Sequence, residues 1–196
     1  HECQLLLDQN LGRKTEDYKA LVPNYCKCLV GPEYAILRPE FAELREYSLA
    51  RRSNPILKKI FVSMGGIDKD NITETVLEIL NSSDLPKDCS IDVVMGFHAP
   101  WLEQVKNRAK KMKYTTKVLV NIADMARRMA EADLSVGAAG GTSWERSTLG
   151  LPSFLMVLAE NQRTNADNLK QFGAARDFSA ITFSLFLKDN HRLNLQ

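Results

Sequence analysis

The sequence predicts an α/β protein, with a Rossmann-like parallel sheet and helices on both of its faces. From Ile56 onward, short apolar runs alternate with segments of helical periodicity. This alternation is typical of a parallel sheet wrapped by helices. Several of the apolar runs end in glycine, which lets the backbone turn sharply where a buried strand ends.

The expected elements follow one another with short connections. Strands are expected at 59–63, 91–95, 117–120, 133–136 and 154–158. Helices are expected from 70 or 71 to 80, over 100–112 and 125–132, from 142 or 143 to before Gly150, and over 164–172. The expected helix caps are Asp70 or Asn71, Asp124, and Thr142 or Ser143, because short polar side chains accept hydrogen bonds from free amides. Residues 183–196 lack a clear helical stop signal, and the sequence does not place them.

Residues before about Arg52 lack this rhythm and indicate short strands and turns. The polar segment 51–55 is the best candidate for a linker. We therefore expect residues 1–53 to be the tail of an N-terminal domain with an interdomain crossover, and 54–196 to be a ligand-binding domain. Because the chain starts at His1, close to the apolar run 5–7, we expect it to be a fragment of a larger protein.

Composition argues against several classes of function. The 26 basic and 24 acidic residues nearly cancel, so no strong field exists to recruit nucleic acid or a membrane surface. The four cysteines and three histidines lack the spacing of a metal site, and neither a metal nor a cofactor is expected. Cys26 and Cys28 are expected on one face of a strand, as core residues. No apolar run is long enough to span a bilayer and no signal peptide opens the chain, so a cytoplasmic protein is expected.

The first candidate site lies at the end of the strand expected at 59–63. There Ser63 and Met64 precede the paired glycines Gly65 and Gly66. Paired glycines let a ligand approach the backbone closely, and the following helix can offer free amides to a phosphate. An ordinary turn explains these glycines equally well. Neither a P-loop nor a GxGxxG fingerprint is present, which disfavours ATP and NAD.

The second candidate site is the glycine-rich loop 137–141 and the start of the helix after it. Gly140 and Gly141 clear space at the carboxyl edge of the sheet, and Thr142 or Ser143 can cap the helix beside a bound phosphate. Glu145 can accept hydrogen bonds from ribose hydroxyls, or it can be a surface carboxylate that interacts with the helix dipole. The neighbouring Trp144 is expected to pack internally.

The third candidate site is the pair Asn161 and Gln162, which follows the strand expected at 154–158. Amide side chains both donate and accept hydrogen bonds, as recognition of sugar hydroxyl or acetamido groups requires. A polar turn that caps the next helix is the alternative. Because parallel strands end at one edge, the three loops should converge there. His98 follows a strand and a glycine, but a surface position is expected for it.

These loops resemble the nucleotide-sugar-binding domain of GT-B-type enzymes. The resemblance implies that the chain contains the C-terminal domain of a GT-B-type fold and a remnant of the N-terminal domain. The segments LVGPEYAILRPEF (29–41), VSMGGID (62–68) and GAAGGTSWERSTLGLPSFLMVLAENQ (137–162) resemble one family more closely. This family comprises the UDP-2,4-diacetamido-2,4,6-trideoxy-β-L-altropyranose hydrolases of pseudaminic acid biosynthesis. That family cleaves the anomeric C–O bond with water and needs no metal, and its product serves surface-glycan decoration.

The resemblance also implies roles for individual residues. Gly65 and Gly66 would face the diphosphate, Glu145 the ribose, and Asn161 with Gln162 the sugar, with Thr142 and Ser143 supporting a phosphate. Arg38 would approach the cleft or form an interdomain ion pair, and Met64 is a further candidate for the cleft.

The catalytic histidine of that family lies in a GxGH loop near its N-terminus. This loop is absent here, and neither His98 nor His191 has an equivalent context. We therefore expect no catalytic residue in this chain and no activity of the chain alone. The expected partners are a UDP-sugar and the missing N-terminal domain. A GT-B glycosyltransferase with a UDP-sugar donor, or a non-catalytic nucleotide-sugar-binding module, are the alternatives.

Overall fold

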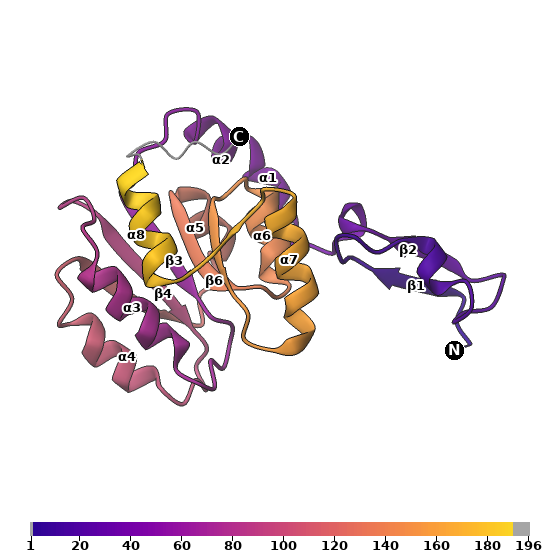
Figure 1. Ribbon diagram of the computed structural model, residues 1–196, viewed down its shortest axis with the longest axis horizontal. Helices are drawn as coiled ribbons and strands as arrows, with labels where there is room; N and C mark the ends of the chain where they lie inside the picture. The colour runs from indigo at the N-terminus through magenta and orange to yellow at the C-terminus, as the bar shows by residue number, and fades with distance from the viewer. Residues whose placement is uncertain (1, 190–196) are drawn as a thin grey trace.

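A six-stranded parallel sheet forms the centre of the computed structural model, which describes residues 2–189 (Figure 1). Its strand order is β5-β4-β3-β6-β7-β8, and all neighbouring strands run parallel. The strands are β3 (Lys59–Ser63), β4 (Ser90–Met95), β5 (Thr115–Val120), β6 (Leu134–Ala138), β7 (Ser153–Met156) and β8 (Arg176–Asp177). The predicted fold class is confirmed.

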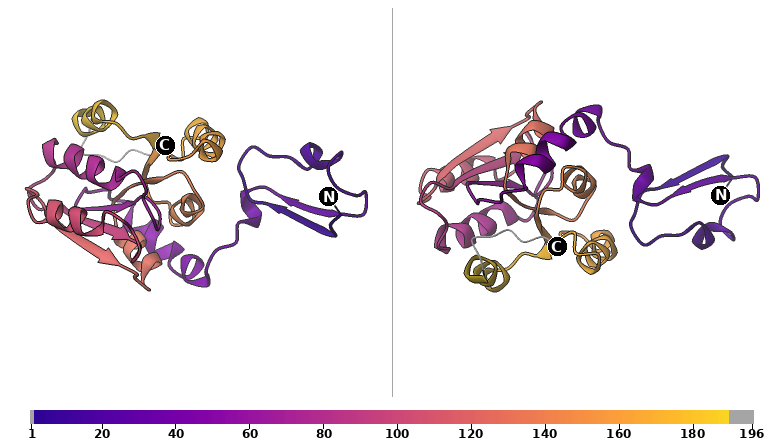
Figure 2. Two further views of the ribbon diagram at one scale, coloured as in Figure 1. Left: turned by 90° about the horizontal axis from the view of Figure 1, so that it is seen from below. Right: turned by 90° about the horizontal axis from the view of Figure 1, so that it is seen from above.

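Helices cover both faces of this sheet (Figure 2). Successive residues of β3 point to opposite faces: Ile60 and Val62 belong to one core cluster and Phe61 to the other. The helices are α1 (Pro39–Glu43), α2 (Arg45–Arg51), α3 (Ile72–Ser82), α4 (Leu102–Ala109), α5 (Met125–Glu131), α6 (Thr142–Thr148), α7 (Arg163–Gln171) and α8 (Ala180–Asp189). Side chains of α3, α4 and α8 fill the first cluster, and those of α1 and α5 fill the second.

The sequence did not place α8, which packs against the sheet through aromatic rings. Phe183 is fully buried and its ring lies 5.4 Å from that of Phe154 in β7. Phe178 and Phe186 complete the cluster, at 5.9 Å and 5.3 Å from Phe154. These contacts hold the end of the described chain beside α3.

A small unit, separate from the main sheet, precedes α1 (Figure 1). Strands β1 (Leu5–Asp8) and β2 (Lys27–Val30) pair in parallel, and the 3-10 turns η1 (Thr15–Tyr18) and η2 (Pro32–Tyr34) lie beside them. Large apolar side chains remain exposed here, such as Ile36 at 76%. Within the same first 53 residues, α1 and α2 pack against the main domain instead, so the division at residue 53 remains a proposal.

Two expectations about local structure are wrong. Cys26 and Cys28 are only half-buried, and Cys26 precedes β2 rather than lying within it. The Sγ atom of Cys26 instead lies 3.4 Å from that of Cys3. Helix α4 spans Leu102–Ala109 and is shorter than the helix expected over 100–112; just before its start, the indole of Trp101 donates a hydrogen bond to the Lys69 carbonyl.

The helices of the described part are short. None over residues 2–189 combines the length and the apolar character needed to cross a bilayer.

Candidate functional site

The sheet has a topological switch point between its central strands β3 and β6. From β3 the chain proceeds through β4 to β5, whereas from β6 it proceeds the other way through β7 to β8. Connections that leave in opposite directions open a crevice at the carboxyl ends of the strands, where α/β proteins bind ligands. Both glycine loops predicted from the sequence follow these two strands directly.

The first loop presents exposed glycine backbone at the end of β3. Gly65 has a φ angle of +89°, a conformation that other residues rarely adopt. Gly66 lies outside that left-handed region, and a Cβ atom there would meet nothing within 4 Å. The neighbouring loop presses against it from the other side, since a Cβ atom on Gly96 would clash with the Gly66 carbonyl.

The helix after this loop is already capped by the protein. The carboxylate of Asp68 accepts hydrogen bonds from the amides of Ile72 and Thr73, both at 2.9 Å. Asn71 occupies the N-cap position with a φ angle of +55° but makes no side-chain cap. The expectation that α3 offers free amides here to a phosphate is therefore wrong, and the exposed groups at this position are those of the glycine backbone.

The second loop also differs from expectation at its helix start. Gly141, with a φ angle of −56°, is the N-cap of α6, and neither Thr142 nor Ser143 caps it. The Ser143 side chain is only 2% exposed, and its hydroxyl accepts a hydrogen bond from Arg146 at 3.0 Å. Ser143 thus supports the loop from below. Trp144 is buried, as expected.

Beneath this loop lies a guanidinium that the sequence did not suggest. Arg146 is 2% exposed, and its Nη2 donates to the Ala138 carbonyl at 2.7 Å and to the Ser143 hydroxyl. These bonds join the two ends of the loop. A Cβ atom on Gly137 would clash with Nη1, so that glycine makes room for the guanidinium. Burial lowers the pKa of Arg146 to about 10, which leaves the group charged at neutral pH.

Glu145 lies in the first turn of α6 with its side chain 18% exposed. Its Oε1 is 3.8 Å from Nη2 of Arg38, and Arg38 also pairs with Glu40 at 3.3 Å. Burial raises the pKa of Glu145, while the charges of Arg38 and Arg146 oppose that rise. Because the contact with Arg38 is long and half-exposed, the carboxylate retains capacity to accept hydrogen bonds from a ligand.

The third loop contacts the second one. Gln162 accepts a hydrogen bond from the Leu158 amide at 3.0 Å, and its Nε2 lies 3.6 Å from where a Gly140 Cβ would stand. Asn161, one residue earlier in the turn η3 (Glu160–Gln162), is exposed. The buried Asn165 donates to the Ala139 carbonyl at 3.0 Å, which ties α7 to the glycine loop.

Other candidates do not join this group. The Met64 side chain is 3% exposed and lies in the hydrophobic core, so its proposed place in the cleft is wrong. His98 is exposed, as expected, with its ring against Phe97 at 5.1 Å. His191 lies outside the described residues. Within residues 2–189, no cluster of three or more histidine, cysteine or acidic side chains could hold a metal ion.

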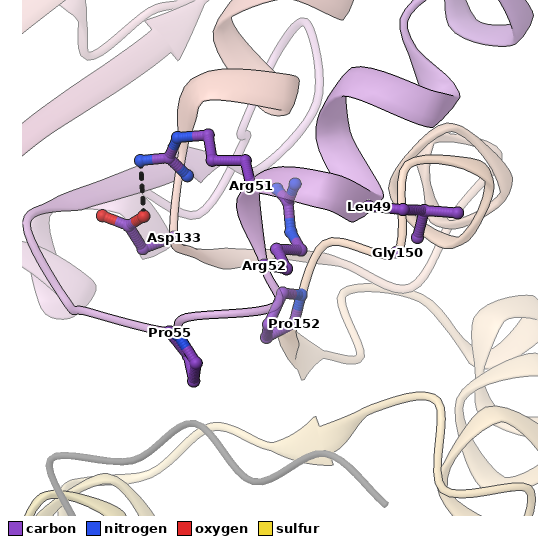
Figure 3. Close-up of a pocket in the computed structure, with 7 residues that line it drawn as sticks. All are labelled: Leu49, Arg51, Arg52, Pro55, Asp133, Gly150 and Pro152. Carbon is purple, nitrogen blue, oxygen red and sulfur yellow. Dashed lines mark ion pairs between the residues drawn. The ribbon is translucent and has the colours of Figure 1, made fainter.

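A pocket of about 200 Å³ opens at the opposite, amino edge of the sheet (Figure 3). Its two arginines are engaged by the protein itself. Arg51 pairs with Asp133 at 2.6 Å. Arg52 donates from Nη2 to the carbonyls of Met129 at 3.1 Å and Ala132 at 2.8 Å, where α5 ends. This pocket therefore marks where the linker after α2 is fastened to the domain.

Sequence reasoning missed Arg146 and Asn165, because both lie in helical segments where polar residues are expected to face solvent. The spacing of Arg146 carried a weak signal. It follows Ser143 by three residues, which places both side chains on one face of the helix.

The fold, together with a family match over most of the sheet domain, defines a nucleotide-sugar-related, glycosyltransferase-like domain of the GT-B type. The chain belongs to the family described as the glycosyltransferase family 28 C-terminal domain, whose model matches residues 59–187.

Three curated relatives are longer than this chain. It is 35% identical over 140 residues to the uncharacterized protein MJ1062 of Methanocaldococcus jannaschii, covering 70% of this chain and 28% of that protein. It is 33% identical over 148 residues to the spore coat polysaccharide biosynthesis protein SpsG of Bacillus subtilis, covering 75% and 42%. It is 28% identical over 173 residues to the UDP-2,4-diacetamido-2,4,6-trideoxy-beta-L-altropyranose hydrolase of Campylobacter jejuni, covering 88% and 59%.

Solved structures share the fold. The crystal structure of Acinetobacter baumannii MurG matches with a TM-score of 0.63 at 21% identity, over 96% of this chain and 58% of that one. At this identity, the likeness concerns the architecture.

Proposed function

We propose that this chain binds the UDP part of a nucleotide-activated sugar in the crevice between β3 and β6. It would do so as the C-terminal part of a two-domain GT-B-type enzyme. We further propose that this enzyme hydrolyses the anomeric C–O bond of a UDP-linked diacetamido-trideoxy sugar, which releases UDP and a free sugar for pseudaminic acid synthesis. The relative described as the corresponding hydrolase, 28% identical over 88% of the chain, supports this substrate class.

Glycines that the protein's own packing does not require carry this proposal. At Gly66 and Gly141, an added Cβ atom would meet nothing within 4 Å, and neither residue has a left-handed φ angle. Glycine in place of alanine costs about 0.5–1 kcal/mol of stability through chain entropy in regular elements. Close approach of an outside molecule to the backbone accounts for both glycines, and phosphate binding by backbone amides requires such an approach.

Different residues around the crevice would then contact different parts of the ligand. We propose that the glycines of both loops face the diphosphate, that Glu145 accepts the ribose hydroxyls, and that Asn161 with Gln162 contacts the sugar. Thr142 lies at the start of α6 beside the proposed diphosphate, and Ser143 supports the loop through Arg146. The chain spans 59% of the hydrolase relative, and the group that activates water is proposed to lie in the remainder.

A glycosyltransferase is the second candidate, favoured by the description of the family model and by the likeness to MurG. The same crevice serves both reactions, because they differ in whether water or an acceptor hydroxyl attacks the anomeric carbon. Binding of the nucleotide sugar by this chain without turnover is consistent with a complete enzyme of either kind, hydrolase or glycosyltransferase.

Calorimetric titration with UDP, ATP and NAD tests the binding proposal. We expect UDP to bind and the other two to bind more weakly. Gly66→Ala and Gly141→Ala should keep or slightly raise the melting temperature, yet weaken UDP binding because each Cβ atom intrudes on the ligand. Equal binding of ATP, or alanine variants with unchanged UDP affinity, would contradict the assignment.

Turnover assays separate the two reactions. A protein that carries the complete two-domain enzyme should release UDP from the UDP-sugar without any acceptor if it is a hydrolase. Release that begins only when an acceptor is added would favour the transferase. The 196-residue chain alone should release no UDP, because loss of a general base removes about 10²–10⁴-fold in rate. Turnover by this chain would place the base within it.

A further inference from the structure

Arg146 is a buried cation that forms no ion pair in the described structure, although the charge of the preceding residue, Glu145, acts on it electrostatically. Arginine is almost never fully buried unless it is paired, because removing a charge from water is costly. The Arg146 side chain is 2% exposed, but it forms no ion pair with any side chain that the structure describes. Both of the bonds that it donates end on neutral oxygen atoms, and its Nε has no partner among the described residues.

The guanidinium lies at the switch point of the sheet. Its Nη1 occupies the space beside Gly137 where a side chain would project, and the same position is 2.9 Å from the Ser63 carbonyl at the end of β3. Nη2 reaches the Ala138 carbonyl at the end of β6. The positive charge therefore lies near the ends of the two central strands, from which both glycine loops continue.

We propose that Arg146 supplies the buried charge that selects a diphosphate in this crevice, and that the bound anion adds to the compensation that Glu145 gives without an ion pair. This inference rests on the proposed function and deepens it, because it assigns the preference for an anionic ligand to one residue. Arg146 acts from below, as a positioning residue, by fixing the glycine loop and by stabilising negative charge above it. A preorganised charge acts strongly where water is excluded.

Arg52 provides a contrast within the same molecule. Arg52 is half-buried, and its Nε likewise has no partner among the described residues, but its guanidinium donates to carbonyls at the C-terminal end of α5, where the helix dipole is negative. It lines the pocket beside Asp133 and Pro152, which precede β6 and β7 at the amino ends of the strands. Its charge is thus compensated by the protein, which makes Arg52→Met a matched control for the loss of a buried guanidinium.

The test is titration of the 196-residue chain with UDP and with uridine, together with thermal melting. The neutral variants Arg146→Met and Arg146→Gln should weaken UDP binding by about tenfold or more, with uridine binding unchanged. Arg146→Lys should retain UDP affinity within about threefold, or 0.7 kcal/mol. Arg52→Met should lower the melting temperature and leave the UDP affinity as it was.

Two results would overturn the inference and leave the proposed function in place. A folded neutral variant that binds UDP like the wild type would show that the charge of Arg146 does not contribute to UDP binding. Equal losses of UDP and uridine affinity, with no rescue by lysine, would show that Arg146 only supports the loop. Failure of the wild type to prefer UDP over uridine would instead refute the proposed function itself. If neither neutral variant folds, inorganic diphosphate must still raise the melting temperature of the wild type and of Arg146→Lys.

Discussion

Replacing Glu145 with glutamine changes one atom at the centre of the proposed nucleotide site. The carboxylate is 18% exposed and has one charged contact, at 3.8 Å from Arg38. Glutamine keeps the shape and one acceptor oxygen but removes the negative charge. If the carboxylate accepts the ribose hydroxyls, the loss should appear in ligand affinity rather than in folding.

The magnitude follows from the hydrogen bonds at stake. Bonds to a charged group contribute about 1.5–3 kcal/mol, against about 0.5–1.5 kcal/mol for neutral ones. One such difference for a ribose hydroxyl is about 1–2 kcal/mol, which corresponds to a loss in UDP affinity of about tenfold. Arg38→Met is the control for the ion pair, and an exposed pair of this length contributes less than about 1 kcal/mol.

The pKa of Glu145 gives the same prediction a pH dependence. Burial raises this pKa in the folded protein, so the folded state holds the proton more tightly than the unfolded chain does. The stability that this provides is present below the unfolded value near 4.5 and is lost as the pH rises through the folded value. At neutral pH, Glu145→Gln should therefore be at least as stable as the wild type.

Calorimetry with uridine between pH 4 and 8 avoids titration of the phosphate groups. Wild-type affinity should rise as Glu145 ionises, and the profile of the glutamine variant should be flat over the same range. Unchanged uridine and UDP affinity in a folded variant would refute the ribose assignment. A lowered melting temperature at neutral pH with unchanged binding would indicate a surface carboxylate that stabilises the helix.

Further substitutions test the loops and the small N-terminal unit. Asp68→Ala should lower the free energy of unfolding by about 1–2 kcal/mol in urea titration, because two α3 amides lose their acceptor. Gly96→Ala should cost about 1–3 kcal/mol, measured the same way, because its Cβ atom meets the neighbouring loop. A thiol oxidant should join Cys3 to Cys26, detected by mass spectrometry as the loss of two hydrogens. Partial burial and the Cys3 thiol raise the pKa of Cys26 to about 11, so this reaction should accelerate with rising pH.

Periodicity predicted the architecture of the domain because the sheet is buried on both faces. After Lys59 at the start of β3, strands β3 and β6 consist of apolar or small residues, and the glycines that follow them mark where each strand ends. Helix α8 was not predicted because its contacts are long-range. Phe183 is recognisable as a core residue only when Phe154 lies beside it.

The location of the candidate site could be predicted from the sequence, but the hydrogen bonds within it could not. Parallel strands bring the loops together without any knowledge of side chains. The capping of α3 by Asp68 depends on a turn in which Asn71 adopts a positive φ angle, and no pattern in the sequence indicates that turn. Arg146 was missed because a guanidinium inside a helix can turn inward only where a neighbouring glycine leaves space.

The pairing of β3 with β6 joins segments that are far apart in the sequence. Ile60 pairs with Ile91 on one side but with Leu134 on the other, so the second pairing must close a far longer loop. Closing a longer loop costs more chain entropy, and non-local pairings slow folding. The crevice lies on this seam between two halves that are each local in sequence. A ligand that bridges both glycine loops would therefore stabilise the pairing of β3 with β6. Its main effect on kinetics would be a lower rate of unfolding at this pair of strands.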